Sequence, residues 1–195
     1  SACNLDCAYC FYLSKRVLPG GPGSGHMPDE VLERFVKDYI DSVTSDEVVF
    51  SWQGGEPTLL GLEFFEKVVT LQAKHAKPGQ RIENDLQTNG TMLDDDCARF
   101  LKQHRFLVGL SIDGPREIHD HCRITKHAEP TFDQVFAAAK MLQKHGVRFN
   151  TLTCVHRYNA SRPLDVYRFL RREIGSTYIQ FIPIVEIRGF ENMAP

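Results

Sequence analysis

Helical and strand-like patterns alternate along most of this 195-residue chain, and this alternation limits its possible folds more than any other feature. The apolar spacing of amphipathic helices is found at residues 28–43, 62–76, 94–104, 131–146 and 163–175, and short apolar runs at 47–52, 81–90, 106–114, 147–155 and 178–185 predict strands. Strands that alternate with helices form parallel sheets, so the sequence predicts an α/β fold. An open doubly wound sheet and a barrel both satisfy this pattern.

The composition is that of one globular domain, with a formal net charge of −2 and therefore no basic surplus for binding nucleic acid. No apolar run is long enough to span a membrane, and no signal peptide opens the chain, so we expect a cytoplasmic protein. A Gly- and Pro-rich stretch at residues 19–28 predicts a flexible loop. Because the chain begins at Ser1 without an initiator Met, we expect a fragment whose preceding strand is missing.

Polar or glycine-containing clusters follow four of the expected strands, at residues 53–57, 87–91, 111–115 and 180–186. One such cluster would indicate only a turn. In a parallel sheet, however, the carboxyl ends of the strands meet at one edge, and this edge is where ligands bind. Four clusters in succession therefore predict a site for a large polar ligand along this edge.

Three cysteines lie close together in the spacing C-x3-C-x2-C, at Cys3, Cys7 and Cys10. A structural zinc site needs four ligands, and the run at residues 119–122, which we expect to be a solvated polar loop, is a poor source of the fourth. A redox pair formed by Cys7 and Cys10 would leave Cys3 without a role. An iron–sulfur cluster held by three cysteines fits best, because one iron keeps an open coordination position. The other cysteines are expected to be small buried apolar side chains; they are Cys97, Cys122 and Cys154.

This three-cysteine motif, with an aromatic residue before its last cysteine, resembles the signature of radical S-adenosylmethionine (SAM) enzymes. Longer strings resemble one family in this superfamily, the anaerobic sulfatase-maturating enzymes of the branch with a C-terminal auxiliary-cluster domain. These strings are CNLDCAYCFYL, WQGGEPTL, QTNGT, SIDGP with HDHCR, and QFIPIVE. The resemblance implies a partial (β/α)6 TIM-like barrel of the radical SAM type that lacks its first strand.

The resemblance also implies roles for individual residues. Cys3, Cys7 and Cys10 would ligate a 4Fe-4S cluster, and SAM would bind the fourth iron through its amino and carboxylate groups. Arg123 would pair with the SAM carboxylate through its guanidinium fork, whereas Glu56 could contact the cofactor or serve only to stabilise the fold. The other implied cofactor-binding residues are Tyr9, Gly54, Gly55, Ser111 and either Ile184 or Val185, and the implied substrate-binding residues are Tyr12 and Gln53.

The implied reaction begins when the reduced cluster transfers one electron to SAM, which yields methionine and a 5′-deoxyadenosyl radical. This radical takes a hydrogen atom from Cβ of a sulfatase cysteine or serine, and loss of a second electron and a proton leads to formylglycine. The implied partners are the sulfatase polypeptide and an electron donor such as ferredoxin or flavodoxin. Two alternatives stay open: a maturase that crosslinks or cyclises another ribosomal peptide, and a non-catalytic zinc or iron–sulfur module.

Two parts of the family pattern are not found in the sequence. No strand precedes Ser1 and no cysteine-rich segment follows Pro195, so we expect residues 1–195 to be a radical SAM core domain without the auxiliary iron–sulfur domain. The aspartate that serves the family as presumed catalytic base lies in that second region, so no catalytic residue is assigned. We expect a fragment that binds a cluster but has little activity on its own.

Overall fold

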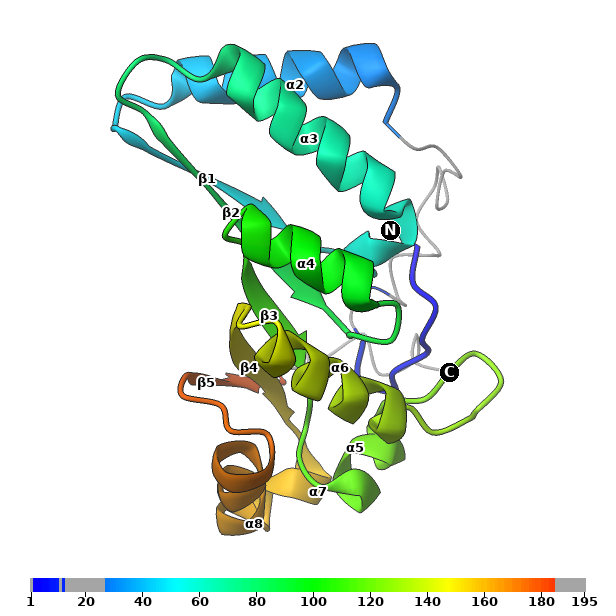
Figure 1. The fold of residues 1–195 in the computed structure, drawn as a ribbon. Helices are drawn as coiled ribbons and strands as arrows, with labels where there is room; N and C mark the ends of the chain where they lie inside the picture. Colours follow the sequence, from blue (N-terminus) through cyan, green and yellow to red (C-terminus); the bar gives the residue numbers. More distant parts are fainter. Residues whose placement is uncertain (1, 11, 13–26, 185–195) are drawn as a thin grey trace.

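Five parallel strands form one curled sheet in the computed structural model, which describes residues 2–10, 12 and 27–184 (Figure 1). The strands lie side by side in chain order, and every neighbouring pair is parallel. They are β1 (Glu47–Trp52), β2 (Arg81–Thr88), β3 (Leu107–Ser111), β4 (Arg148–Val155) and β5 (Ile179–Pro183). The structure confirms the predicted α/β class and partial TIM-like barrel, and it decides against the open doubly wound sheet.

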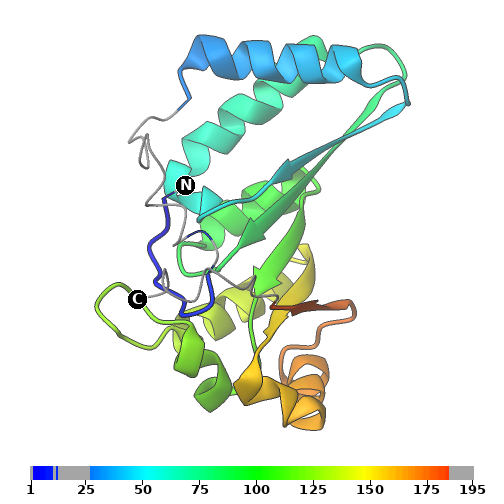
Figure 2. The same cartoon turned by 180° about the vertical axis from the view of Figure 1, so that it is seen from behind.

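The long helices cover the convex face of the sheet, and Figure 2 shows the opposite, concave face with the strands in front. These helices are α2 (Asp29–Ser42), α3 (Leu62–His75), α4 (Asp95–Gln103) and α6 (Phe132–Lys144), each close to its predicted bounds. The helix expected at 163–175 is divided into α8 (Pro163–Arg168) and a π-helical turn, η3 (Phe169–Glu173). In this turn the Ile174 N–H donates to the Phe169 carbonyl, five residues back.

Three short helices were not predicted, and each follows the end of a strand. They are η2 (Pro57–Leu60) after β1, α5 (Arg116–Cys122) after β3 and α7 (Arg157–Ala160) after β4. Their sequences are too short for a helical apolar period to be recognised. Because they begin directly beyond the strand ends, they shape the edge of the sheet where ligands bind in parallel folds.

The main hydrophobic core lies between the sheet and helices α3, α4 and α6, and a second cluster joins α2 to β1. On α2, the buried side chains are Leu32, Val36 and Ile40. Phe35 and Tyr39, which share the predicted apolar stripe, remain largely exposed and pack against Phe50 at the margin of the sheet. The apolar stripe on α2 is therefore wider than its buried face.

The scattered cysteines differ from one another in burial. Cys122 is buried as predicted, whereas Cys97 and Cys154 are only partly buried, so the prediction for those two is wrong. Most of the Gly- and Pro-rich stretch at 19–28 lies outside the described residues. No helix in the described part of the chain is long and apolar enough to cross a membrane.

Candidate functional site

The N-terminal segment, residues 2–10, crosses the edge of the sheet where the strands end (Figures 1 and 2). Just beyond β1, the Glu56 N–H donates to the carbonyl of Ala2 at 2.8 Å. Just beyond β2, the Asn89 side chain donates to the side-chain oxygen of Asn4 at 2.9 Å. Backbone and side-chain bonds together therefore fix the three-cysteine motif at the predicted ligand-binding edge.

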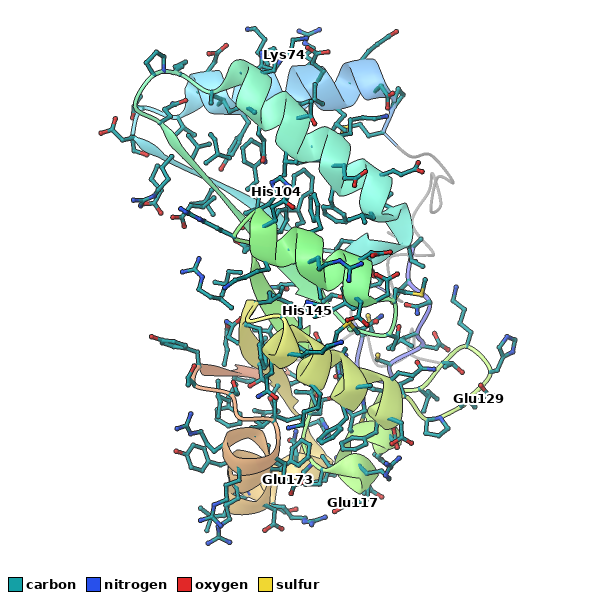
Figure 3. The ribbon with its side chains drawn as sticks, in the orientation of Figure 1. Lys74, His104, Glu117, Glu129, His145 and Glu173 are labelled. Atoms are coloured by element: carbon teal, nitrogen blue, oxygen red, sulfur yellow. The ribbon has the colours of Figure 1, made fainter. Side chains whose placement is uncertain are left out.

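The loop that follows α5 binds the other side of this segment. Leu5 forms an antiparallel bridge with Thr125, and the Ala8 N–H donates to the carbonyl of Cys122 at 2.9 Å. Figure 3 shows Glu129 on this loop, which projects beside the N-terminal segment. The segment is thus held between the strand ends and a loop from the middle of the chain.

The three thiols of the segment interact with one another. Burial raises the pKa of Cys7 to about 12, and the charge of Arg123 partly opposes this shift. Burial also raises the pKa of Cys3, although its sulfur accepts a hydrogen bond from the Leu5 N–H at 3.4 Å. A thiolate at Cys10 would raise the pKa of both. Ionising Cys3 and Cys7 is therefore favoured by a nearby positive charge, which iron would supply.

A single metal ion would need its ligand side chains gathered in one compact site. Among the described residues, no three His, Cys, Asp or Glu side chains are gathered tightly enough to bind one ion. A tetrahedral zinc ion would need its sulfurs only about 3.8 Å apart, given a Zn–S distance of about 2.3 Å. In a four-iron cubane each thiolate binds a different corner, so the sulfurs lie farther apart.

A tight glycine turn follows β1. Gly54 and Gly55 have φ angles of 105° and 62°, which side-chain-bearing residues rarely adopt. The turn therefore presents bare backbone at the edge crossed by the cysteine segment. The close approach to a cofactor that the resemblance implies for both glycines stays a prediction.

Glu56 is almost fully buried, and both of its carboxylate oxygens accept hydrogen bonds from the protein. One oxygen accepts from the hydroxyls of Thr58 and Thr88, each at 2.7 Å, and the other accepts from the Asn89 N–H at 2.6 Å. These bonds tie the end of β1 to the end of β2. Glu56 therefore has the stabilising role that the sequence left as an alternative, and its contact with a cofactor stays a prediction.

A second buried carboxylate, Asp113, follows β3 and binds groups from three parts of the chain. One oxygen accepts from the Tyr9 hydroxyl at 2.5 Å and from Arg123 Nε at 3.0 Å. The other accepts from the Cys154 N–H at 3.1 Å. The guanidinium carbon of Arg123 also lies 5.5 Å from the centre of the Tyr9 ring. Asp113 thus links the cysteine segment, a buried cation and the end of β4.

His119 lies beneath this cluster and corrects one prediction. The run at 119–122 is not a solvated loop but the end of α5, and the His119 side chain is completely buried. Its Nδ1 accepts from the Asp113 N–H at 3.4 Å, and its Nε2 lies 3.1 Å from the Thr131 hydroxyl. Burial lowers the pKa of His119 to about 2, so it is a neutral structural side chain.

His156, at the end of β4, is the one buried side chain of the described residues with an unpaired polar atom. Its Nε2 has no hydrogen-bond partner there and lies 4.0 Å from the Asp113 carboxylate. Its ring stacks on Tyr9 with centroids 5.7 Å apart. Burial lowers the pKa of His156, while the charge of Asp113 opposes this effect.

The remaining sequence-predicted residues lie at or near the same edge. Ser111 is the half-buried last residue of β3, Gln53 is exposed just after β1, and Ile184 is half-buried just after β5. Tyr12 is half-buried beyond the cysteine segment. Val185 lies outside the described residues, so the choice between Ile184 and Val185 stays open.

The concave face of the sheet carries polar side chains that the sequence analysis did not assign. Strand alternation and register place one row of residues on this face, and within it the Ser51 hydroxyl donates to Asp85 at 2.6 Å. Newly recognised polar members of the row toward the carboxyl ends of the strands include Ser51, Asp85, Gln87, Asn150 and Gln180, and they share this face with Ser111, which the resemblance had assigned to the cofactor. The buried opposite row includes Phe50 and Leu86. The period-two alternation of polar and apolar residues was the signal that could have revealed this surface.

Comparison with known proteins identifies the family. The model of the Radical SAM superfamily matches residues 1–170. The chain belongs to the radical SAM superfamily. Members of this superfamily use a 4Fe-4S cluster and SAM, which is the chemistry that the thiols at this edge suit.

The relatives of this radical SAM chain narrow the comparison. It is 45% identical over 186 residues to a serine-type anaerobic sulfatase-maturating enzyme of Bacteroides thetaiotaomicron, and 44% identical over 197 residues to a cysteine-type enzyme of Clostridium perfringens. These matches cover 95% and 98% of this chain but 44% and 52% of the relatives. The chain therefore spans about half the length of the curated relatives that it matches.

Solved structures give the same result. "Native anSMEcpe with bound AdoMet" matches the whole chain with a TM-score of 0.89 and 42% identity, covering 54% of that protein. A structure of the same protein with AdoMet and Cp18Cys peptide has a TM-score of 0.87. Streptococcus suis SuiB bound to its precursor peptide SuiA has a TM-score of 0.72 at 15% identity, which shows a shared fold only.

Proposed function

We propose that residues 1–195 form the radical SAM core domain of an anaerobic sulfatase-maturating enzyme. The observation that carries the proposal is the three-cysteine segment bound across the carboxyl ends of the strands, in a chain 45% and 44% identical to two proteins of that name. The relatives include both serine-type and cysteine-type enzymes at nearly equal identity, so the proposal covers both substrate residues.

In this proposal, Cys3, Cys7 and Cys10 hold a 4Fe-4S cluster. When bound, the cluster and SAM would together supply a 5′-deoxyadenosyl radical. This radical would oxidise Cβ of a sulfatase cysteine or serine, on the way to formylglycine. The electron comes from a donor such as ferredoxin or flavodoxin. Because burial raises the pKa of the Cys3 and Cys7 thiols, binding of iron by these two residues would release their protons to solvent.

The other residues at this edge bind and orient the reactants. The Gly54–Gly55 turn would offer backbone groups without side chains to the amino end of SAM, and Arg123 would pair with its carboxylate. The polar row on the concave face, which includes Asp85 and Gln87, offers hydrogen bonds to a peptide backbone. Positioning of the reacting carbon and exclusion of water are the contributions of the protein.

Anaerobic reconstitution tests this function. The protein is loaded with iron and sulfide, reduced, and incubated with SAM and with two peptides that carry the sulfatase motif as its cysteine or serine form. We expect a brown protein, formation of 5′-deoxyadenosine, and the mass change of formylglycine in at least one peptide. Comparing the two peptides also tells which sulfatase type is the substrate.

Cysteine variants provide the matched controls. Cys7→Ala should lose most bound iron and all 5′-deoxyadenosine, whereas Cys97→Ala, on α4 and away from the segment, should retain both. If Cys7→Ala keeps its cluster, the ligand assignment is wrong. If 5′-deoxyadenosine forms but both peptides stay unmodified while another precursor peptide is crosslinked, the alternative maturase function is correct.

A further inference from the structure

We propose that Asp113 is the positioning residue that aims Arg123 at the carboxylate of bound SAM and couples this cation to the cysteine segment through Tyr9. The inference rests on the proposed function, because it concerns the cofactor of that site. It assigns a role to a carboxylate that neither the cysteine motif nor the glycine turn explains.

Asp113 has no solvent contact, and each of its oxygens is already engaged. One oxygen accepts from Tyr9 at 2.5 Å and from Arg123 at 3.0 Å, and the other accepts from the Cys154 N–H at 3.1 Å. The bond to Arg123 uses Nε and not the terminal nitrogens. A guanidinium held by Nε is fixed in its plane, and in this proposal its terminal nitrogens are the groups that bind the SAM carboxylate.

The partners of Asp113 come from three separate parts of the chain. Tyr9 lies between two cysteines of the motif, Arg123 follows α5, and Cys154 lies near the end of β4. The Tyr9 ring lies next to Arg123 on one side, at 5.5 Å, and stacks on His156 at 5.7 Å. A movement of Asp113 would therefore shift the cysteine segment and the cation together.

An asparagine cannot replace this carboxylate. Asparagine offers one oxygen and one NH2 group, but the site presents donors on both sides. Either the Cys154 N–H or the Tyr9–Arg123 pair would face an NH2 group, and Arg123 cannot release a proton to adapt. The charge of Arg123 would also lose its buried counter-ion, and the cation would turn away from its present plane.

The test compares two ligands in Asp113→Asn: SAM, and decarboxylated SAM, which lacks the group that Arg123 would bind. Equilibrium dialysis against the anaerobically loaded protein gives both dissociation constants. Both Arg123 and the fourth iron would hold the SAM carboxylate, so we expect the wild type to prefer SAM over decarboxylated SAM by well over tenfold. We expect Asp113→Asn to reduce this preference about tenfold, while the part that depends on the iron stays. Its iron and sulfide content should stay within twofold of the wild type.

Asp120→Asn is the matched control. Asp120 lies on α5, between Asp113 and Arg123 in the chain. Its side chain accepts hydrogen bonds from the N–H groups of Thr131 and Phe132 and, within the described residues, makes none with Tyr9 or Arg123. This variant should be less stable but should keep the preference for SAM. Equal loss of preference in Asp113→Asn and Asp120→Asn would show a general structural effect and overturn the inference.

Tyr9→Phe keeps the test decisive if Asp113→Asn does not fold or load iron. It removes one of the two bonds to the shared oxygen and should reduce the preference for SAM about threefold, with the effect appearing in SAM affinity and in the SAM-induced change of the reduced-cluster EPR signal. An unchanged preference in Tyr9→Phe would then refute the role of Asp113. A wild type that binds neither cluster nor SAM would instead refute the proposed function.

Discussion

Two buried carboxylates stand at the ligand-binding edge, and they bind very different partners. Glu56, after β1, accepts only from neutral groups of the neighbouring turn and strand; these donors belong to Thr58, Thr88 and Asn89. Its bonding is complete within the β1–β2 half of the edge. Nothing in this arrangement needs a ligand to be stable.

Asp113, after β3, binds a cation and the cysteine segment as well as the backbone of β4. Beside it, His156 keeps an unpaired buried nitrogen among the described residues. The β3–β4 half therefore holds charge and unused hydrogen-bonding capacity. A buried carboxylate at this edge can therefore serve either to stabilise the fold or to position a ligand. The groups that donate hydrogen bonds to it indicate which of these two roles it has.

The largest effect should follow from Glu56→Gln, which breaks the neutral half of the comparison. The amide NH2 would face at least one donor among Thr58, Thr88 and Asn89, and a buried donor would lose its acceptor. We expect a loss of about 3 kcal/mol in the free energy of unfolding of the protein without cluster. Urea denaturation measures it.

Thr88→Val serves as the smaller control for this change. It removes one hydroxyl that donates to Glu56 and should cost about 1 kcal/mol. If Glu56→Gln costs less than Thr88→Val, the carboxylate does not join β1 to β2 energetically. The distinction between the two halves of the edge would then fail.

The pH dependence of stability should be a smaller effect than that of Glu56→Gln, and it arises from His119, which is hydrogen-bonded to the Asp113 backbone. Burial lowers the folded-state pKa of His119 to about 2, so the unfolded chain binds the extra proton below pH 6.5. Stability from this group is present above pH 6.5 and is lost as the pH falls. Between pH 6.5 and 5 we expect a loss of about 2 kcal/mol.

His119→Gln should remove this part of the pH dependence, as measured by urea denaturation at pH 7, 6 and 5. The exposed loop variant His127→Gln is the control and should follow the wild-type curve. Parallel curves for the wild type and His119→Gln would show that His119 is not held neutral by burial.

The elements of the sheet were largely predictable from local patterns. The helix and strand periods depend on neighbouring residues, so all five strands were located within about two residues at most ends. The convergence of the four polar clusters at one edge also followed, because parallel topology brings the strand ends together. The placement of the cysteine segment across this edge did not follow from local patterns.

The Asp113 cluster could not be predicted in the same way. Tyr9 and Asp113 are far apart in the chain, and only the curl of the sheet brings them within hydrogen-bond distance. The run containing His119 was wrongly interpreted as solvated because its residues are polar, yet α5 turns His119 inward against Thr131. Pairing between distant polar side chains has no local period that a sequence displays.

Two glycines at opposite ends of the sheet allow the ligand-binding edge to be compared with the other end. Gly90 follows Asn89 with φ +79°, and an added Cβ would lie 2.6 Å from the buried side chain of Leu110. Gly79, in the turn before β2, has φ +88° but nothing within 4 Å. Gly79→Ala should cost about 1 kcal/mol from backbone strain alone, and Gly90→Ala about 2–3 kcal/mol. Equal unfolding free energies for the two variants would show that Leu110 moves aside freely.

The smallest effect is expected at an exposed carboxylate, Asp95, which tests whether burial or charge makes the edge carboxylates important. Bonds from His145 and Lys144 lower the pKa of Asp95 from 3.8 to about 2, so its stabilising contribution is full above about pH 4 and is lost toward pH 2. Asp95→Asn should lower the urea midpoint slightly at pH 6. The difference in urea midpoint between the wild type and this variant should be smaller at pH 3 and should also decrease with added salt. A difference in urea midpoint as large as that of Glu56→Gln, or one that stays the same at low pH, would mean that charge alone, without burial, controls the stability of this fold.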